Sequence, residues 1–251
     1  MTKAMYNQAA DFYTDFVQEE LSSKMSVLSV VTEQTVKALG SVAGCSVCDV
    51  ACGEGHVSRR LASQGAQVTG VDISQSLLDK AKQLTPAELD IQYIQADAQS
   101  LNQLDSASFD YVVSNMALMD IADHKSMFDH CWRIVKDAGV LVVSMLHPCF
   151  ESPFDANNPP IELTSAGNFL AARVRRYLEE GHWSSGGNGV RGKVGAYHRT
   201  LSTYINDLLN AGFRLDAIYE PSLEAGDYKT VEEQWFSKIP KGLVIKCLKQ
   251  S

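Results

Sequence analysis

The sequence of 251 residues contains no apolar run that approaches the roughly 18–20 residues needed for a membrane-spanning helix. Its first twenty residues lack the apolar centre of a signal peptide, and they carry more acids than a transit peptide does. We therefore expect a cytoplasmic protein without a membrane partner. Apolar residues make up 45% of the chain and charged residues 21%, an average composition that supports a sizeable core and excludes global disorder.

Basic residues are in the minority. The chain has 22 Lys and Arg against 30 Asp and Glu, a formal net charge of −8, so it repels phosphate backbones on average and nucleic acid is an unlikely partner. The basic run at Arg173, Arg175 and Arg176 is interpreted as the solvated face of a helical stretch.

Cysteine does not form a metal-binding pattern. Cys45 and Cys48 have C-x-x-C spacing, but no second pair follows, and structural zinc needs four ligands. The residues around this pair read as a buried strand. We expect free thiols and no metal site.

Short apolar segments alternate with helical periodicity along most of the chain. Helices are predicted in 2–20 and 24–39, and strand–helix alternation then follows until 146. This order predicts an α/β, Rossmann-like sheet of seven strands, mostly parallel, with the last strand antiparallel and helices covering both faces. The predicted strands are 46–52, 66–73, 91–98, 109–116, 139–146, 213–220 and 243–249, and the predicted helices between them are 56–64, 75–84, 123–136 and 201–210.

The alternation breaks only after Pro148. We expect a single domain with an N-terminal helical cap (1–40), a ligand-binding core (41–147), an insertion (148–196) and the last strands of the core (197–251). An insertion at the carboxyl end of a strand lies over the crevice where open sheets bind ligands. We therefore predict that this insertion, together with the N-terminal helix, forms a mobile lid that sets acceptor choice; the alternative is a permanently packed cap or a dimer arm. Flexibility would come from the glycines and apolar surface from the aromatic residues: Gly186, Gly187, Gly189, Phe150, Phe154, Tyr177 and Trp183.

The first strand–turn–helix carries the strongest chemical signal. Gly53 and Gly55 allow the backbone to approach a ligand closely at the N-terminus of the next helix. Asp72, nineteen residues beyond Gly53, ends the next strand, where a carboxylate can accept both hydroxyls of a ribose. A dinucleotide fold would have a third glycine where this chain has Ser58, and Asp49 would repel a pyrophosphate. A cofactor with a ribose and an ammonium fits better.

The segment DVACGEG at 49–55 resembles motif I of the class I S-adenosylmethionine-dependent methyltransferases. The later strand ends agree with that family: VDIS at 71–74, QADA at 95–98 and FDYVVSNM at 109–116. The resemblance covers 40–150 well and 197–249 moderately. It implies S-adenosylmethionine as cofactor and S-adenosylhomocysteine as product.

The same resemblance assigns roles to residues at the strand ends. The Gly53–Gly55 turn would cradle the methionine part of the cofactor, and Asp49 would help to hold its ammonium directly or through water. Asp72 would bind the ribose hydroxyls, with Ile73 packing on the adenine. The other implied contacts are the Asp97 carboxylate and the Ala98 amide at the adenine, and Asn115 and Met116 near the sulfonium.

Two further positions complete the implied cofactor site. Ala51 stands where many family members have glycine, a departure that the neighbouring glycines make tolerable. Tyr13 lies in the segment YNQAADFY at 6–13, which resembles an N-terminal helix that closes the pocket in these enzymes. Tyr13 is then either a contact of the methionine carboxylate or a core aromatic residue.

The acceptor is expected to be a small organic molecule, methylated at O, N or C. The segments HPCF at 147–150 and YHRTLSTY at 197–204 resemble a small-molecule branch that includes toxoflavin-biosynthesis enzymes. A lid rich in Tyr, Trp and Phe suits a flat, apolar or heteroaromatic acceptor. His147 and His198 are the candidate general bases. His124 and His130 are set aside, because they fall on a predicted surface helix.

Two other functions remain open from the sequence. One is a dinucleotide-dependent oxidoreductase, which Ser58 and Asp49 disfavour. The other is a non-catalytic module that binds S-adenosylmethionine as a signal, because intact cofactor motifs do not by themselves require turnover.

Overall fold

The computed structural model describes residues 2–151, 161–185, 189–224, 226 and 228–250. Three helices open the chain: α1 (Thr2–Gln8), α2 (Ala10–Ser22) and α3 (Val27–Leu39). The predicted N-terminal helices are confirmed, with one difference: a turn at Ala9 divides the first into α1 and α2. Among the described residues no helix is long and apolar enough to cross a membrane.

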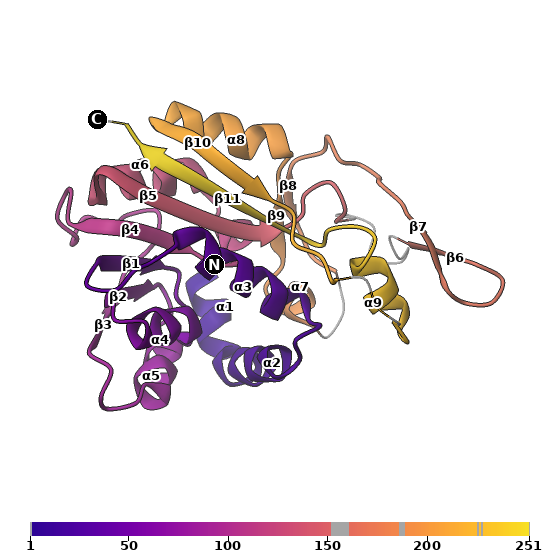
Figure 1. The fold of residues 1–251 in the computed structure, drawn as a ribbon, viewed down its shortest axis with the longest axis horizontal. Helices are drawn as coiled ribbons and strands as arrows, with labels where there is room; N and C mark the ends of the chain where they lie inside the picture. The colour runs from indigo at the N-terminus through magenta and orange to yellow at the C-terminus, as the bar shows by residue number, and fades with distance from the viewer. Residues whose placement is uncertain (1, 152–160, 186–188, 225, 227, 251) are drawn as a thin grey trace.

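Seven strands form one sheet in the order β10-β11-β5-β4-β1-β2-β3 (Figure 1). β11 runs antiparallel to both β10 and β5, and the other neighbours pair parallel. The predicted seven-stranded, mostly parallel sheet with an antiparallel last strand is confirmed. The strands are β1 (Ser46–Val50), β2 (Gln67–Asp72), β3 (Ile91–Gln95), β4 (Phe109–Ser114), β5 (Val135–Leu146), β10 (Phe213–Tyr219) and β11 (Gly242–Lys249).

Helices cover both faces of this sheet, and strand residues alternate between two apolar clusters. Leu141 and Val143 of β5 pack in the cluster beneath α6 (His124–Ile134) and α8 (Leu201–Asn210), whereas Val142 packs in the cluster beneath α3 and α4 (His56–Ser63). All three are fully buried, as expected of a central strand. The helices are α4 (His56–Ser63), α5 (Gln75–Leu84), α6 (His124–Ile134) and α8 (Leu201–Asn210).

The strand order reverses beside β1. The chain runs outward from β1 through β2 to β3, then returns to place β4 on the other side of β1. Such a switch point leaves a crevice at the carboxyl ends of the strands, because the crossover helices leave toward opposite faces. The predicted ligand-binding residues at the ends of β1, β2, β3 and β4 therefore converge there.

The segment after β5 forms small pieces of structure that lie beside the main sheet. A hairpin of β6 (Ile161–Leu163) and β7 (Phe169–Ala172) projects from the body (Figure 1), and β8 (Gly181–Trp183) pairs with β9 (Ala196–His198) around the short helix α7 (Val190–Lys193). A further helix, α9 (Val231–Phe236), precedes β11. The division of the chain into cap, core and lid stays a prediction. Three of the predicted lid residues, Phe154, Gly186 and Gly187, lie outside the described residues.

Two sequence predictions in this part of the molecule are wrong. The arginine-rich stretch is not helical, because β7 pairs with β6 and the ion pair between Arg173 and Glu162 joins that hairpin, after which Arg176 has a positive φ of 50°. His124 is not on a surface, since it is 5% exposed and its Nε2 lies 2.7 Å from Asp207 Oδ2 of α8. Tertiary pairing overrides local propensity in both cases.

Candidate cofactor-binding site

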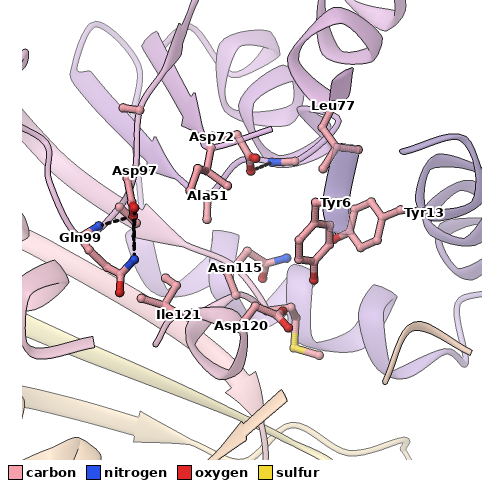
Figure 2. A pocket seen from close by; sticks show the side chains of 16 residues that line it. Tyr6, Tyr13, Ala51, Asp72, Leu77, Asp97, Gln99, Asn115, Asp120 and Ile121 are labelled. Carbon is pink, nitrogen blue, oxygen red and sulfur yellow. Dashed lines mark hydrogen bonds between the residues drawn. The ribbon is translucent and has the colours of Figure 1, made fainter. Parts of the chain in front are cut away.

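A cavity lies at the carboxyl ends of β1, β2, β3 and β4 (Figure 2). Its position is the crevice at the switch point of the sheet. The side walls come from α1, α2 and the segment after β4. Its lining consists of Tyr6, Tyr13, Ala51, Gly53, Asp72, Ile73, Leu77, Ala96, Asp97, Ala98, Gln99, Asn115, Met116, Ala117, Asp120 and Ile121.

Most of the residues predicted for the cofactor line this one cavity: Tyr13, Ala51, Gly53, Asp72, Ile73, Asp97, Ala98, Asn115 and Met116. The structure places Asp49 and Gly55 behind the lining. Gly55 starts α4 with φ 82°, and a Cβ there would lie 2.5 Å from Tyr93 Oη, so close packing requires glycine at this position.

The backbone between β1 and α4 adopts conformations that ordinary residues avoid. Ala51 has φ 59° and Gly53 has φ 56°, both in the left-handed region. The conformation of Ala51 accounts for a preference for glycine at that position, and the alanine costs on the order of 1 kcal/mol in local strain. The turn exposes the Gly53 backbone to the cavity.

Asp72 joins this turn to β2. Its Oδ2 accepts the backbone N–H of Gly53 at 2.9 Å, and its Oδ1 accepts that of Ser74 at 2.8 Å. Burial raises the pKa of Asp72 to about 6, although these two backbone hydrogen bonds favour the charged form. Each oxygen keeps acceptor capacity for a ligand, because a carboxylate has about four acceptor positions.

Asp49 is buried beneath the turn. The Ser58 hydroxyl donates to Asp49 Oδ2 at 2.6 Å, which links β1 to α4. Burial raises the pKa of Asp49 to about 6, partly offset by the Ser58 hydrogen bonds and by the charge of His56. Ser58, which stands where a dinucleotide motif has its third glycine, thus has a structural role in this hydrogen bond.

A second acid of this loop points elsewhere. Glu54 is 1% exposed and pairs with Arg59 at 2.6 Å and with His56 Nδ1 at 3.2 Å. Burial would raise the pKa of Glu54, but hydrogen bonds and charge from His56 and Arg59 hold it below its ordinary value. This carboxylate stabilises the start of α4 and does not line the cavity.

Asp97 lies at the end of the cavity opposite the tyrosines (Figure 2). Its Oδ1 accepts both the backbone N–H and the side-chain Nε2 of Gln99, each at 2.9 Å. Ile73, Ala98 and Ile121 give the cavity lining apolar surface. A flat heterocycle with an exocyclic amino group matches this combination of apolar surface and carboxylate.

Asn115 and Met116 line the cavity where β4 ends. The Asn115 side chain is held by the hydroxyls of Thr32 and Ser144, at 2.9 and 2.8 Å. The Ser144 hydroxyl also accepts the Met116 N–H at 3.0 Å, and Met116 has a positive φ of 55°. These bonds fix the backbone at the middle of the cavity.

Tyr6 and Tyr13 cover the remaining side. Their rings pack edge to face with centroids 5.6 Å apart, and a Cβ added to Gly53 would lie 3.4 Å from Tyr13 Cε1. Burial raises the pKa of both phenols well above the ordinary value, with Asp120 adding to the effect, so both hydroxyls stay protonated. Tyr13 is therefore a wall of the cavity as well as a packed aromatic residue.

Asp120 connects the cavity to the insertion. It belongs to a short 3-10 helix, η1 (Leu118–Asp120), and its Oδ1 accepts a hydrogen bond from Arg191 Nη1 of α7. Both side chains are mostly buried, at 14% and 18% exposed. Lys193 of α7 lies 4.7 Å from the centre of the Phe12 ring of α2. The insertion thus contacts both the core and the N-terminal helices.

The two candidate bases lie outside the cavity. His147 is 2% exposed; its Nε2 lies 2.8 Å from Glu220 Oε1, and its Nδ1 accepts the Cys149 N–H at 3.2 Å. Burial lowers the pKa of His147, which Glu220 partly offsets. His198 is also buried, with Nε2 2.9 Å from the Tyr177 carbonyl oxygen. These bonds give both histidines structural roles, and their part in catalysis stays a prediction.

Several lining residues were not predicted from the sequence, namely Tyr6, Leu77, Ala96, Gln99, Ala117, Asp120 and Ile121. Some of them had a signal. Tyr6 shares a helical stripe with Tyr13, and Gln99 follows the Asp97 strand end directly. No sequence pattern pointed to Asp120, because only the fold brings it beside α1 and α7.

The chain is similar to known methyltransferases over most of its length. Residues 48–143 match a methyltransferase domain family. Two solved structures cover nearly the whole chain. A proposed S-adenosylmethionine-dependent methyltransferase from Listeria monocytogenes has 27% identity and a TM-score of 0.75, over 89% of this chain and 98% of that one. An S-adenosylmethionine-dependent methyltransferase from Mesorhizobium loti has 26% identity and a TM-score of 0.70, over 86% and 96%.

A curated relative is more similar in sequence but over a shorter region. The ubiquinone biosynthesis O-methyltransferase of Coxiella burnetii is 32% identical over 146 residues. This aligned region covers 56% of this chain and 62% of that enzyme. The matched family covers the β1–β5 segment, whose strand ends form the cavity. The sheet order, the glycine turn and these similarities lead to one conclusion: the chain is a class I S-adenosylmethionine-dependent methyltransferase.

Proposed function

We propose that this methyltransferase acts on a small, mostly apolar ring compound, transferring the methyl group to O, N or C. The methyl leaves with its bond electrons remaining on sulfur, the sulfonium becomes a neutral thioether, and the acceptor atom forms the new bond. An acceptor that carries a proton releases it to water or to a base. The similarity to an enzyme named for ubiquinone biosynthesis supports a ring acceptor.

The observation that carries the cofactor assignment is the Asp72 carboxylate, buried at the cavity wall with acceptor capacity left on both oxygens. In the proposed pose Asp72 accepts both ribose hydroxyls. Ile73 and Ala98 pack near the adenine, and Asp97 accepts its amino group. Charge-assisted hydrogen bonds of this kind are about twice as strong as neutral ones.

The methionine end of the cofactor would lie along the Gly53 turn and beside Tyr13. In this pose Asn115 and Met116 stand near the sulfonium, and Asp49 acts from behind the turn through its charge. The aromatic faces of Tyr6 and Tyr13 favour a nearby cation, as a sulfonium is. Tyr6 and Tyr13 thus extend the cofactor site beyond the strand ends.

The lining also argues against a dinucleotide. None of the 16 described residues that line the cavity is Lys or Arg, whereas three are aspartates. A pyrophosphate there would be repelled by Asp72 and Asp97, whereas the ammonium and sulfonium of S-adenosylmethionine would be attracted.

Calorimetry tests the cofactor site. S-adenosylmethionine and S-adenosylhomocysteine are expected to bind, and NAD is not. No heat with either sulfur compound at about 1 mM, a limit of about −4 kcal/mol, would contradict the proposal. Transfer of label from S-adenosylmethionine to a library of small ring compounds then tests the acceptor class. Label that appears in protein or RNA fractions instead would indicate a macromolecular acceptor.

A further inference from the structure

A second cavity adjoins the first. The two cavities share Tyr13, Met116 and Asp120. A methyl group passing from a cofactor in the first cavity to an acceptor in the second would cross at these three residues. The second cavity is lined by Tyr13, Phe16, Glu20, Val27, Leu28, Met116, Met119, Asp120, Leu146, Ser185, Gly189, Val190 and Arg191.

Most of this second cavity is apolar. Phe16 of α2 and Val27 and Leu28 at the start of α3 form one wall. Met119 and Leu146 come from the core. An apolar ring system would therefore bury its faces here, since burial of apolar surface contributes roughly 25 cal/mol per Å².

The charges of the cavity lining do not suit an anion. Arg191 is the only Lys or Arg among its described lining residues, and its guanidinium already donates to Asp120. The Glu151 carboxylate lies close enough to add to the negative field on Arg191. Glu20 adds another carboxyl to the lining, and burial raises its pKa above the ordinary value. The single cation is therefore already compensated by Asp120.

We infer that the second cavity is the acceptor site and that it selects an apolar ring compound that is neutral or cationic over the same ring bearing a carboxylate. The Asp120–Arg191 pair makes this selection, because it neutralises the cation that would otherwise attract an acid. This inference rests on the proposed function, since it names the acceptor class for the same site.

Three probes with one ring system test the selection: 2-naphthol, 1-naphthylmethylamine and 2-naphthoate. Each is titrated at pH 7.5 into protein saturated with S-adenosylhomocysteine. We expect the neutral and cationic probes to bind at least about tenfold more tightly than the carboxylate. Equal or tighter binding of 2-naphthoate would overturn the charge selection, and no binding of any probe would overturn the site itself.

The Asp120→Asn variant makes the test specific. It keeps the shape of the side chain but leaves the Arg191 charge uncompensated, so the ratio of 2-naphthoate to 2-naphthol affinity should rise about tenfold. The matched control is Glu162→Gln, which changes a carboxylate paired with Arg173 in the same insertion, outside both cavities. A loss of stability alone would weaken all probes and would not create a preference for the anion.

Location is tested with Val27→Trp, which places a large side chain in the second cavity. It should abolish probe binding and leave S-adenosylhomocysteine affinity within about twofold. Unchanged probe affinity in this variant would show that the probes bind elsewhere and would overturn the inference. A wild-type protein that fails to bind S-adenosylhomocysteine would instead refute the cofactor site, so the two failures are distinguishable.

Discussion

The Asp72 carboxylate accepts the backbone N–H of Gly53 at 2.9 Å, so the end of β2 holds the turn that follows β1. One side chain thereby shapes the glycine turn and presents acceptor oxygens to the cavity. The two tasks predict different losses on substitution, one in cofactor affinity and one in the order of the turn.

Replacing Asp72 with alanine should weaken S-adenosylhomocysteine binding by about 1.5–3 kcal/mol, the usual cost of losing hydrogen bonds to a charged group. Calorimetry on the folded variant measures this. Asp110→Ala is the control, because Asp110 also accepts a backbone N–H, from Ser46, but at the opposite end of its strand. Equal effects of the two variants would contradict the role of Asp72.

Asp49→Asn should stabilise the fold at neutral pH by up to about 3 kcal/mol, because it removes a buried charge whose pKa is about 6. The folded protein binds more protons than the unfolded chain between about pH 4 and 6, so stability from this group falls as pH rises through that range. Urea unfolding at pH 8 and pH 5 measures the difference. The gain should be largest at pH 8 and shrink toward pH 5; a gain that does not depend on pH would point to another cause.

Cofactor affinity should depend on pH through Asp72, whose pKa is about 6. Ribose hydroxyls donate to the charged carboxylate, so affinity is complete well above pH 6 and falls as the group is protonated. S-adenosylhomocysteine should bind about tenfold more weakly at pH 5 than at pH 8. The Asp72→Asn variant should bind weakly at both pH values, and a wild-type profile that is flat would argue against this contact.

Arg199 should be essential for the segment that carries Asp120. It is 7% exposed, and its Nη2 donates to the Ile121 and Ala122 carbonyls at 2.8 and 2.6 Å. Arg199→Met leaves those carbonyls unpaired, with an expected loss of about 2–4 kcal/mol of folding free energy. Thermal unfolding measures it. Arg176→Met removes an exposed ion pair to Glu179 and should change stability by less than about 1 kcal/mol.

The lid prediction for 148–196 can be tested by limited proteolysis. Arg191 and Lys193 contact Asp120 and the Phe12 ring, so closing the insertion would complete the cavity walls. Cleavage within 148–196 should slow several-fold when S-adenosylhomocysteine and 2-naphthol are added together. Equal resistance with and without ligands would indicate a fixed cap, and equal cleavage would indicate that the segment has no part in binding.

The sheet and the strand-end acids were predictable because both depend on local pattern. Apolar strands alternate with helices, and parallel strands bring Asp72 and Asp97 to the same edge of the sheet whatever the rest of the chain does. Contacts between distant segments were not predictable. His124 is buried against Asp207, a partner 83 residues away in sequence. Asp120 pairs with Arg191, which lies 71 residues away. No local periodicity encodes either pair.

The two adjoining cavities take their walls from different parts of the chain. The first is built mainly from one continuous stretch, 51–121, whereas much of the second comes from 13–28, 185 and 189–191. Under the proposed function, the segments that choose the acceptor are therefore separate from the strands that hold the cofactor. Evolution or a designer can exchange those peripheral segments without changing the sheet register, so acceptor range can diverge while cofactor chemistry is inherited intact.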